Sequence, residues 1–256
     1  MSKRYIRYRE AESSQPAYGV LEGDQVTKLS GPPWTGVEPE GNPLPFNPQA
    51  LVAPVEPSKI VCVGLNYRAH VTASQSADKP PEYPLLFLKP PSSIIGPGDD
   101  IVHPDVSERV DYEAELGVII GKQAKDVDVQ DAEQHIFGFT CVNDVTARDL
   151  QKKDGQWSRA KGFDTFCPVG PWIVPELNYP DVLVEGVLNG EVTQSGRTSL
   201  MIFDILFLVS YISSAMTLNP GDLISTGTPA GIAPMKPGDT IEVRVEGIGS
   251  LQNKVV

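Results

Sequence analysis

Short apolar runs separated by turn residues follow one another along the chain after Lys59. Runs of roughly four to eight residues that are rich in Val, Ile, Leu and Phe are typical of β-strands. The last of them alternates, so that Ile241, Val243 and Val245 share one face of the predicted strand. Many strands and few helices predict a domain that is mainly β with some α. The predicted strands are 60–63, 85–88, 116–120, 137–142, 169–174, 182–188, 223–225 and 241–245.

Helical spacing of apolar residues is clear in one segment. Between residues 200 and 217 apolar side chains recur every three or four positions, and Asn219, Pro220 and Gly221 would end the helix. We expect this helix to cover one face of a sheet. A second helix, shorter and more polar, is expected at 126–134.

The first part of the chain has a different character. A strand is expected at 5–8 and a turn at Gly23 and Asp24, and the segment 31–57 is dense in proline. Proline opposes both helix and central strand. We therefore expect a small N-terminal lobe with a proline-rich connector at 1–55 and a main domain at 56–256.

The composition predicts a compact chain with a small-molecule partner. At 256 residues and 40% hydrophobic content, the chain can bury a substantial core. Its 33 acidic residues outnumber its 21 basic ones, which argues against nucleic acid or an anionic membrane as the main partner. A small anionic substrate stays open if a metal ion and one or two lysines reverse the charge locally.

Location is suggested by what the sequence lacks. The N-terminal residues have no apolar core of the signal-peptide kind, and the apolar stretch at 200–216 falls short of the roughly 20 residues of a membrane span. Cys62, Cys141 and Cys167 lie far apart, each beside apolar neighbours. This favours buried free thiols in a reducing compartment, so we expect a cytoplasmic protein.

Glu113 and Glu115 are the most informative pair of polar residues. On one strand both carboxylates would point to the same face, where they repel each other unless something compensates them. Water can screen them at a surface, one can stay protonated, or a divalent cation can neutralise them. The spacing alone leaves all three interpretations open.

Asp144 follows a predicted strand and offers a third carboxylate. Three carboxylates supply half of the oxygen octahedron that Mg²⁺ prefers and leave the other positions open, as catalysis requires. In the alternative interpretation Glu113 and Glu115 decorate a solvated strand edge. Asp144 would then cap a turn or helix, with Arg148 and Asp149 simply paired.

Other candidate residues are a histidine, two lysines and a loop. His70 follows a predicted strand end in a polar loop, where it can act as a general base or simply be solvated. Lys89 and Lys161 adjoin apolar or aromatic segments, and each can hold a substrate carboxylate or reach solvent. The loop 226–231 offers backbone N–H groups to an anion, or is an ordinary turn. Nucleotide-binding glycine motifs, serine nucleophile elbows, zinc-protease motifs and paired cysteines do not occur in the sequence.

Taken together, six ordered motifs resemble the fumarylacetoacetate hydrolase family across about residues 58–256. Six motifs in one order are more specific than any single motif, so the resemblance favours a metal site at the paired glutamates. The motifs are 59–67 with His70, 84–90, 111–116, 143–151, 163–168 and 226–229.

The resemblance implies a mixed β-sandwich roll of the family's C-terminal type, usually a homodimer. It implies Mg²⁺ or Mn²⁺ held by Glu113, Glu115 and Asp144. It also implies that His70 and Lys161 are catalytic. The residues implied to bind substrate are Lys89, Arg148, Gln151 and Thr228.

The family, as the resemblance implies, acts on small 2-oxo and β-diketo acids by hydrolytic C–C cleavage, decarboxylation or isomerisation. In each case negative charge develops as an enolate, which a metal and Lys161 would stabilise. Smaller members often carry a glutamate three residues after the loop histidine, which orients the imidazole. Here that position is Ala73, so His70 lacks its expected partner unless the loop folds back and brings Glu82 to it.

The leading prediction is a Mg²⁺-dependent enzyme that cleaves a C–C bond hydrolytically in a small 2-oxo acid of the acylpyruvate type. The nearest alternative is an oxaloacetate decarboxylase or keto–enol tautomerase, which needs no nucleophilic water. A further alternative is a non-catalytic scaffold that a metal stabilises. The lysines expected in the pocket argue against a scaffold.

Overall fold

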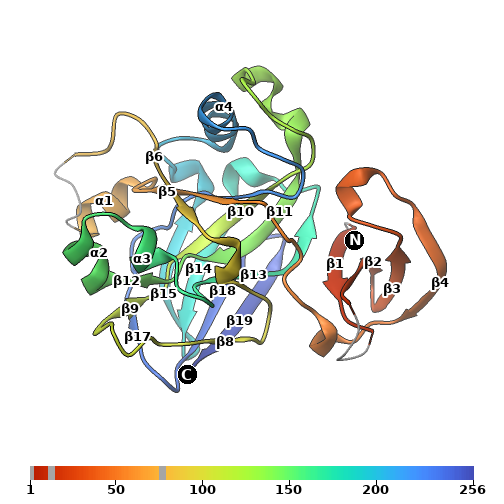
Figure 1. Ribbon diagram of the computed structural model, residues 1–256, viewed down its shortest axis with the longest axis horizontal. Helices are drawn as coiled ribbons and strands as arrows, with labels where there is room; N and C mark the ends of the chain where they lie inside the picture. The colour runs from red at the N-terminus through yellow and green to blue at the C-terminus, as the bar shows by residue number, and fades with distance from the viewer. Residues whose placement is uncertain (1–2, 11–14, 75–78) are drawn as a thin grey trace.

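The computed structural model describes residues 3–10, 15–74 and 79–256, except for the side chains of residues 73 and 74. The protein is mainly β with some α, and its largest element is an 11-stranded sheet (Figure 1). One short strand, β7 (Ile94–Ile95), pairs with β13 at the side of this sheet. The other strands, in order across the sheet, are β4 (Pro39–Pro45), β3 (Gln25–Leu29), β2 (Ala17–Glu22), β1 (Arg4–Tyr8), β13 (Cys167–Val174), β11 (Ile136–Asn143), β10 (Ala114–Ile120), β16 (Leu223–Ser225), β5 (Ile60–Gly64) and β6 (Leu85–Lys89).

Two smaller sheets and a few short helices complete the fold. The 5-stranded sheet has the order β15 (Glu191–Arg197), β14 (Leu183–Leu188), β18 (Thr240–Val245), β19 (Gly249–Val255) and β8 (Asp100–Ile101). The 3-stranded sheet has the order β12 (Thr146–Ala147), β9 (Val110–Asp111) and β17 (Pro234–Met235). The α-helices are α1 (Arg68–Ser74), α2 (Arg148–Asp154), α3 (Ser158–Lys161) and α4 (Ile205–Ala215). The 3₁₀ helices are η1 (Pro33–Thr35), η2 (Pro48–Ala50), η3 (Pro91–Ser93), η4 (Val129–His135), η5 (Tyr179–Asp181) and η6 (Thr198–Leu200).

The main core lies between the large sheet and the 5-stranded sheet, which pack face to face as in a β-sandwich. Leu116 and Val118 of β10 belong to one buried cluster with Val243 and Val245 of β18. The alternation predicted for β18 is therefore confirmed. Helix α4 adds Leu208 and its apolar neighbours to the same cluster and covers one end of the sandwich (Figure 1). None of the helices in the described part of the chain is both long and apolar enough to cross a membrane.

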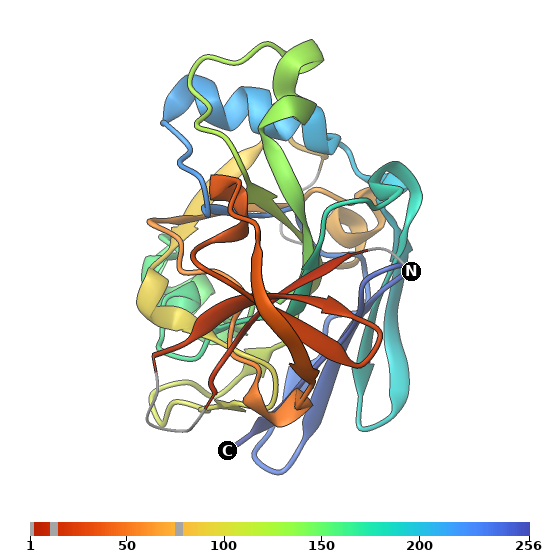
Figure 2. The same ribbon diagram turned by 90° about the vertical axis from the view of Figure 1, so that its right-hand side faces the viewer.

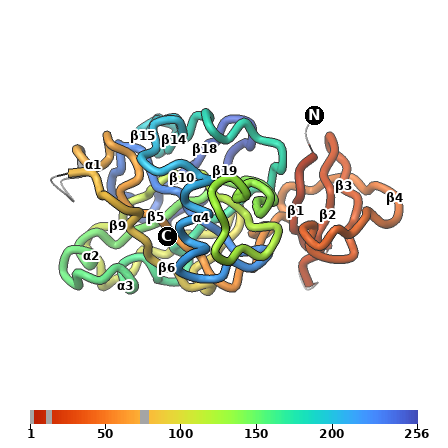
Figure 3. Tube along the Cα trace, turned by 90° about the horizontal axis from the view of Figure 1, so that it is seen from above, coloured from red at the N-terminus to blue at the C-terminus, as the bar shows by residue number. Residues whose placement is uncertain are grey.

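Strands β1 to β4 lie at one end of the molecule, facing the viewer in Figure 2 and at the right in Figure 3. They have a small core of their own around Ile6 and Leu21. They also extend the large sheet, because Tyr5 of β1 pairs with Ile173 of β13. The proline-rich strand β4 lies at the sheet edge, where a missing N–H costs no ladder hydrogen bond. The division of the chain at residue 55 stays a prediction.

The strands predicted from the sequence all form, within two residues of their predicted bounds. The predicted helices need correction. Helix α4 starts only after Asp204, whose side chain accepts a hydrogen bond of 2.8 Å from the backbone N–H of Phe207. The apolar residues before Asp204 lie in η6 and the loop after it, and the polar helix predicted at 126–134 is the 3₁₀ helix η4.

Replacement of Asp204 tests the start of α4. Asp204→Ala should lower the free energy of unfolding by about 1 kcal/mol, because a free N–H of the first helical turn loses its acceptor. For a chain of this size that corresponds to a fall in melting temperature of roughly 2–4 °C. Asp204→Asn, which keeps an acceptor, and Ser214→Ala at an exposed position of the same helix should change it little. Equal melting temperatures for Asp204→Ala and these controls would contradict the assignment.

Candidate metal centre and active site

Three buried carboxylates, from Glu113, Glu115 and Asp144, lie together at one end of the central strands of the large sheet. Each offers an oxygen, and these oxygens all lie within 4.8 Å of one another. The prediction that both glutamates lie on one strand is wrong in detail, because β10 begins at Ala114 and Glu113 precedes it. Between Asp111, the last residue of β9, and the start of β10 the chain passes from the 3-stranded sheet to the large sheet. Glu113 lies in this passage and still reaches the same space as Glu115.

Antiparallel pairing brings Asp144 to the glutamates. The start of β10 pairs with the end of β11, so that Ala114 lies opposite Asn143. The backbone N–H of Asp144 donates to the carbonyl oxygen of Glu113 at 2.9 Å. The side-chain oxygen of Asn143 accepts the backbone N–H of Glu113 at 3.0 Å. A residue just after β11 therefore lies beside a residue just before β10.

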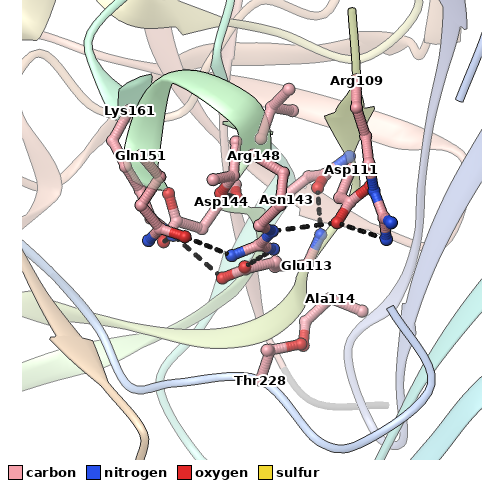
Figure 4. Close-up of polar contacts among 12 residues, drawn as sticks. Arg109, Asp111, Glu113, Ala114, Asn143, Asp144, Arg148, Gln151, Lys161 and Thr228 are labelled. Carbon is pink, nitrogen blue, oxygen red and sulfur yellow. Dashed lines mark hydrogen bonds and ion pairs between the residues drawn. The ribbon is translucent and has the colours of Figure 1, made fainter. Parts of the chain in front are cut away.

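Three cationic side chains surround the carboxylates, and two of them are labelled in Figure 4. The Nζ of Lys89 lies 2.6 Å from Oδ1 of Asp144. The Nζ of Lys161 bridges two carboxylates, at 2.6 Å from Oδ2 of Asp144 and 3.0 Å from Oε2 of Glu113. Arg148 pairs with Glu113 through Nη2. In the described part of the chain the cations and carboxylates of this centre are thus equal in number, which lowers the cost of burying both.

The ion pairs fix the charge state of Glu113 and Lys161. Burial opposes ionisation of Glu113, but Lys161 and Arg148 outweigh it and lower the pKa of the carboxyl below its ordinary value. Burial likewise opposes a charge on Lys161, but Asp144 and Glu113 outweigh it and raise the pKa of the amine. Both groups are therefore ionised near neutral pH.

Glu115 differs from the other two carboxylates, because no cationic side chain in the described part of the chain pairs with it. Its Oε2 accepts hydrogen bonds from Oγ of Ser225 at 2.5 Å and from the backbone N–H of Gly227 at 2.8 Å. Burial, followed by the negative charges of Asp144 and Glu113, raises the pKa of Glu115 to about 8. A nearby cation would be needed to keep this carboxylate ionised at neutral pH.

The donor set fits a divalent cation. Carboxylate oxygens are the hard donors that Mg²⁺ and Mn²⁺ prefer, and three carboxylates leave positions for water or substrate oxygens. Glu115 is held through one oxygen by Ser225 and Gly227, which leaves its other oxygen for a ligand. A divalent cation would also supply the positive charge that Glu115 lacks.

His70 lies in α1 and not in a polar loop, and it is buried. Its Nδ1 has no hydrogen-bond partner among the residues that the structure describes. Burial lowers the pKa of the imidazole, so the ring is neutral near neutral pH. Glu82 is exposed and does not bond to this nitrogen, and the side chain of Ala73 lies outside the described part.

Thr228 and Gln151 are held by hydrogen bonds within the site. The hydroxyl of Thr228 donates to the carbonyl oxygen of Ala114 at 2.9 Å and accepts from Nε2 of Gln194 at 2.8 Å. The hydroxyl proton of Thr228 is therefore already donated to a hydrogen bond within the protein. The side-chain oxygen of Gln151 accepts from Nη1 of Arg148 at 2.8 Å.

A small cavity collects most of the predicted site residues. All of them line it except Lys89, which reaches Asp144 from outside the cavity. The volume open to the centre of a water molecule in this cavity is about 20 Å³, which is roughly the room that one water needs. Several of the lining side chains are paired with one another, so a substrate larger than water must separate some of these ion pairs to enter.

Several residues that build the site were not predicted. Ser225 directly precedes a motif and so lies where a local signal exists. Gly227, by contrast, belongs to the loop 226–231, and the prediction that this loop offers a backbone N–H to an anion is confirmed by its hydrogen bond to the carboxylate of Glu115. Gln194 comes from β15 and carries no local signal, since only the fold brings it to Thr228. Asp111 contacts Arg148, whereas the pairing of Arg148 with Asp149 does not occur. Asp149 instead accepts the hydroxyl of Ser107 at 2.6 Å, and Trp157 adds an aromatic wall to the cavity.

The fold and the centre define a class of protein: a mainly β chain with a buried acidic site that can hold a divalent cation. Comparison with known families is more specific. The family model described as fumarylacetoacetate (FAA) hydrolase C-terminal matches residues 59–256, and the model described as Rv2993c-like, N-terminal matches residues 3–54. The chain belongs to the fumarylacetoacetate hydrolase family and is an enzyme of that family, which confirms the resemblance of its motifs.

Relatives with known names include two tautomerases. The chain is 43% identical over 218 residues to oxaloacetate tautomerase YisK of Bacillus subtilis, with 80% of this chain and 72% of the relative covered. It is 42% identical over 226 residues to the human mitochondrial oxaloacetate tautomerase FAHD2A, with 83% and 71% covered. Protein Rv2993c of Mycobacterium tuberculosis is 50% identical over 219 residues, with 84% and 82% covered.

Two of the similar solved structures are named as isomerases. The 2-hydroxyhepta-2,4-diene-1,7-dioate isomerase of Mycobacterium marinum superposes with a TM-score of 0.89 at 43% identity, with 100% of this chain and 98% of that chain covered. The 5-carboxymethyl-2-hydroxymuconate delta-isomerase of Mycobacterium smegmatis gives 0.90 at 44% identity, with 99% of both chains covered. Similarity over nearly the whole chain supports one shared fold.

Replacement of Glu115 separates metal binding from stability. Glu115→Gln keeps the shape of the side chain and an oxygen that accepts hydrogen bonds. It removes the negative charge, which is unfavourable in the metal-free protein. The folded-state pKa of about 8 lies above the ordinary value of 4.5, so folding takes up a proton and the metal-free chain loses stability as the pH rises between these values. The variant should lose this pH dependence and, in EDTA near neutral pH, melt at or above the temperature of the unsubstituted chain.

Mg²⁺ should stabilise the unsubstituted chain and the control but not Glu115→Gln, by about 2.7 kcal/mol at roughly a hundred times its dissociation constant. Scanning fluorimetry with EDTA or Mg²⁺ measures both effects, and Glu82→Gln, at an exposed position, is the matched control. A Mg²⁺ response of Glu115→Gln as large as that of the control would remove Glu115 from the ligand set.

Proposed function

We propose that the chain is a divalent-metal-dependent tautomerase that interconverts the keto and enol forms of a small 2-oxo dicarboxylate of the oxaloacetate type. The observation that carries the proposal is the buried triad of carboxylates, which shares a cavity with Lys161 and Arg148. The same cavity holds a histidine that has no orienting partner among the described residues. The names of the tautomerase and isomerase relatives support the same reaction type. They favour it over the hydrolytic C–C cleavage that led the sequence-based interpretation.

The charges of the site favour a dianion as substrate. Among the residues that the structure describes, three carboxylates face three cations, so a bound Mg²⁺ or Mn²⁺ would leave the site with two positive charges. A dicarboxylate such as oxaloacetate neutralises both of them, whereas a monocarboxylate leaves one unbalanced in a buried cavity. This argument favours oxaloacetate over an acylpyruvate.

The proposed metal ligands are Glu113, Glu115 and Asp144. When bound there, the metal would hold the substrate through its carboxylate and 2-oxo oxygens and stabilise negative charge on the 2-oxo oxygen. Lys161, whose raised pKa keeps it protonated, offers a second positive charge and an N–H donor at the same place. Lys89 holds Asp144 from outside the cavity and thereby fixes its orientation.

Tautomerisation moves one proton and needs no other reactant. From keto to enol, a proton leaves the carbon beside the 2-oxo group, the C–H electron pair becomes the C=C bond, and the oxygen gains a proton. His70 is neutral and lines the cavity, so it is suited to accept the proton from carbon. Activation of water for C–C hydrolysis demands an oriented imidazole, and the described residues offer the Nδ1 of His70 no partner that would orient it. A homodimer and a cytoplasmic location stay predictions.

The reaction itself is tested by proton NMR on purified protein with Mg²⁺. Freshly dissolved enolic oxaloacetate should convert to the keto form faster than in Mg²⁺ alone, with no pyruvate formed beyond the background. Pyruvate with CO₂ would instead indicate a decarboxylase. Conversion of acetylpyruvate to pyruvate and acetate would restore hydrolysis as the leading function.

Replacement of Lys161 separates binding of the metal from chemistry. Lys161→Met keeps an unbranched side chain that is one atom shorter and removes its charge, so the tautomerase rate should fall by roughly 10²–10³-fold. Mg²⁺ should bind at least as tightly, because Glu113 and Asp144 lose a competing cation. Ultraviolet absorbance of the enol measures the rate and calorimetry measures Mg²⁺ binding. Lys152→Met, at an exposed position of α2, should alter neither, and a Lys161→Met enzyme with the full rate would exclude the proposed role.

A further inference from the structure

Arg148 divides its guanidinium among three partners (Figure 4). Its Nε donates to Oδ2 of Asp111 at 2.9 Å, its Nη1 donates to Gln151 at 2.8 Å, and its Nη2 pairs with Glu113. Gln151 and Glu113 line the cavity, whereas Asp111 does not. The two terminal amino groups of Arg148 therefore serve the site, while its Nε is held outside the cavity.

Asp111 lies between an outer and an inner arginine. Its side chain has no exposed surface, and in the described part of the chain both of its oxygens accept hydrogen bonds from guanidinium groups. Arg109 approaches from the solvent side, with Nε 2.8 Å from Oδ1 and Nη2 3.2 Å from Oδ2, and its side chain is 48% exposed. Arg148 approaches from the cavity side and is 11% exposed. Removal of the buried carboxylate would leave the inner cation without this partner.

The backbone fixes the two side chains relative to each other. Asp111 ends β9 and pairs with Thr146 of β12, and α2 begins with Arg148 directly after β12. The backbone N–H of Arg148 donates to the carbonyl oxygen of Arg109 at 2.8 Å. Asp111 is therefore held on a sheet, where it provides a rigid support for a side chain at the start of a helix.

We propose that Asp111 is a positioning residue that holds Arg148 ready for a carboxylate of the substrate. Anchored through Nε, the guanidinium keeps one plane and presents Nη1 and Nη2 together, the arrangement that binds a carboxylate with two parallel hydrogen bonds. Arg148 exchanges Glu113 for the substrate when a dicarboxylate enters. An unanchored arginine would have to be ordered at that moment, which weakens binding. The role toward substrate rests on the proposed function, whereas the anchoring of Arg148 does not.

The anchoring is tested by NMR without any ligand. In the unsubstituted chain the Nε–H signal of Arg148 should exchange slowly with water, since its acceptor is fully buried. The signal is assigned by its loss in Arg148→Lys. Asp111→Ala should abolish the protection, because it removes the oxygen that accepts the Nε–H of Arg148. Arg109→Met, which removes only the outer arginine, should retain it, and a protected signal in Asp111→Ala would overturn the anchoring.

The role toward substrate is tested with oxalate, a dianion that cannot tautomerise. Asp111→Ala should bind oxalate roughly tenfold more weakly than the unsubstituted chain in the presence of Mg²⁺, the loss expected for one charge-assisted hydrogen bond. With oxaloacetate, KM should rise more than kcat falls. Mg²⁺ alone should bind with unchanged affinity, since the side chain of Asp111 is hydrogen-bonded only to arginines among the described residues. Arg109→Met should resemble the unsubstituted chain in every respect.

Two further outcomes are decisive. In the double variant Asp111→Ala with Arg148→Lys, oxalate binding should be no weaker than in Arg148→Lys alone, because both changes remove the same anchored guanidinium; full additivity would overturn the proposal. If Asp111→Ala does not fold, Arg148→Lys alone must show the rise in KM, since it keeps the charge but lacks Nε. Failure of the unsubstituted chain to bind oxalate or convert oxaloacetate would count against the proposed function, and the NMR experiment would still decide on the anchor.

Discussion

Mutual compensation of buried charges is the interaction on which the rest of this structure depends. Ionised side chains leave water only if partners of opposite charge and hydrogen-bond donors replace it. Asp144 meets this condition through two lysines, and Glu113 meets it through Lys161 and Arg148. Glu115 has hydrogen bonds but no cationic partner among the described residues, and its raised pKa reflects that difference. The uncompensated carboxylate is the feature that fits a divalent cation.

The large sheet brings these groups together at one end of its central strands. Strands β11, β16 and β5 end there and β10 begins there. This follows because β10 is antiparallel to both β11 and β16 while β16 is parallel to β5. Asp144 follows β11, Ser225 ends β16, and the glutamates lie at the start of β10. The small 3-stranded sheet adds Asp111 and leads into α2, which carries Arg148. The residues of the candidate site thus lie on strand ends and short helices that the core holds in place, which suits a site that must keep its geometry.

The same charges also explain how one family can perform several reactions. A metal held by the three carboxylates, together with Lys161, would stabilise an enolate whichever bond is later made or broken. The fate of the enolate depends on the groups that can move a proton or orient water. Here the imidazole of His70 is buried and neutral, and its Nδ1 lacks a partner in the described part of the chain, which favours the transfer of a proton over the activation of water.

The sequence by itself determined the strands, the family and the residue types of the site. Local alternation and apolar runs are set by neighbours along the chain, so β18 and the other core strands could be predicted, as could a motif such as Asp144 after a strand. Signals that depend on one side chain were readable but easily missed: Asp204 shortens the predicted helix because it caps α4. Only the tertiary structure decided that Glu113 lies outside β10, that Gln194 holds Thr228, and that Asp111 anchors Arg148. These contacts join segments that lie far apart in sequence. They are stabilised by strand pairing and by the compensation of buried charges, and no local sequence pattern encodes either effect.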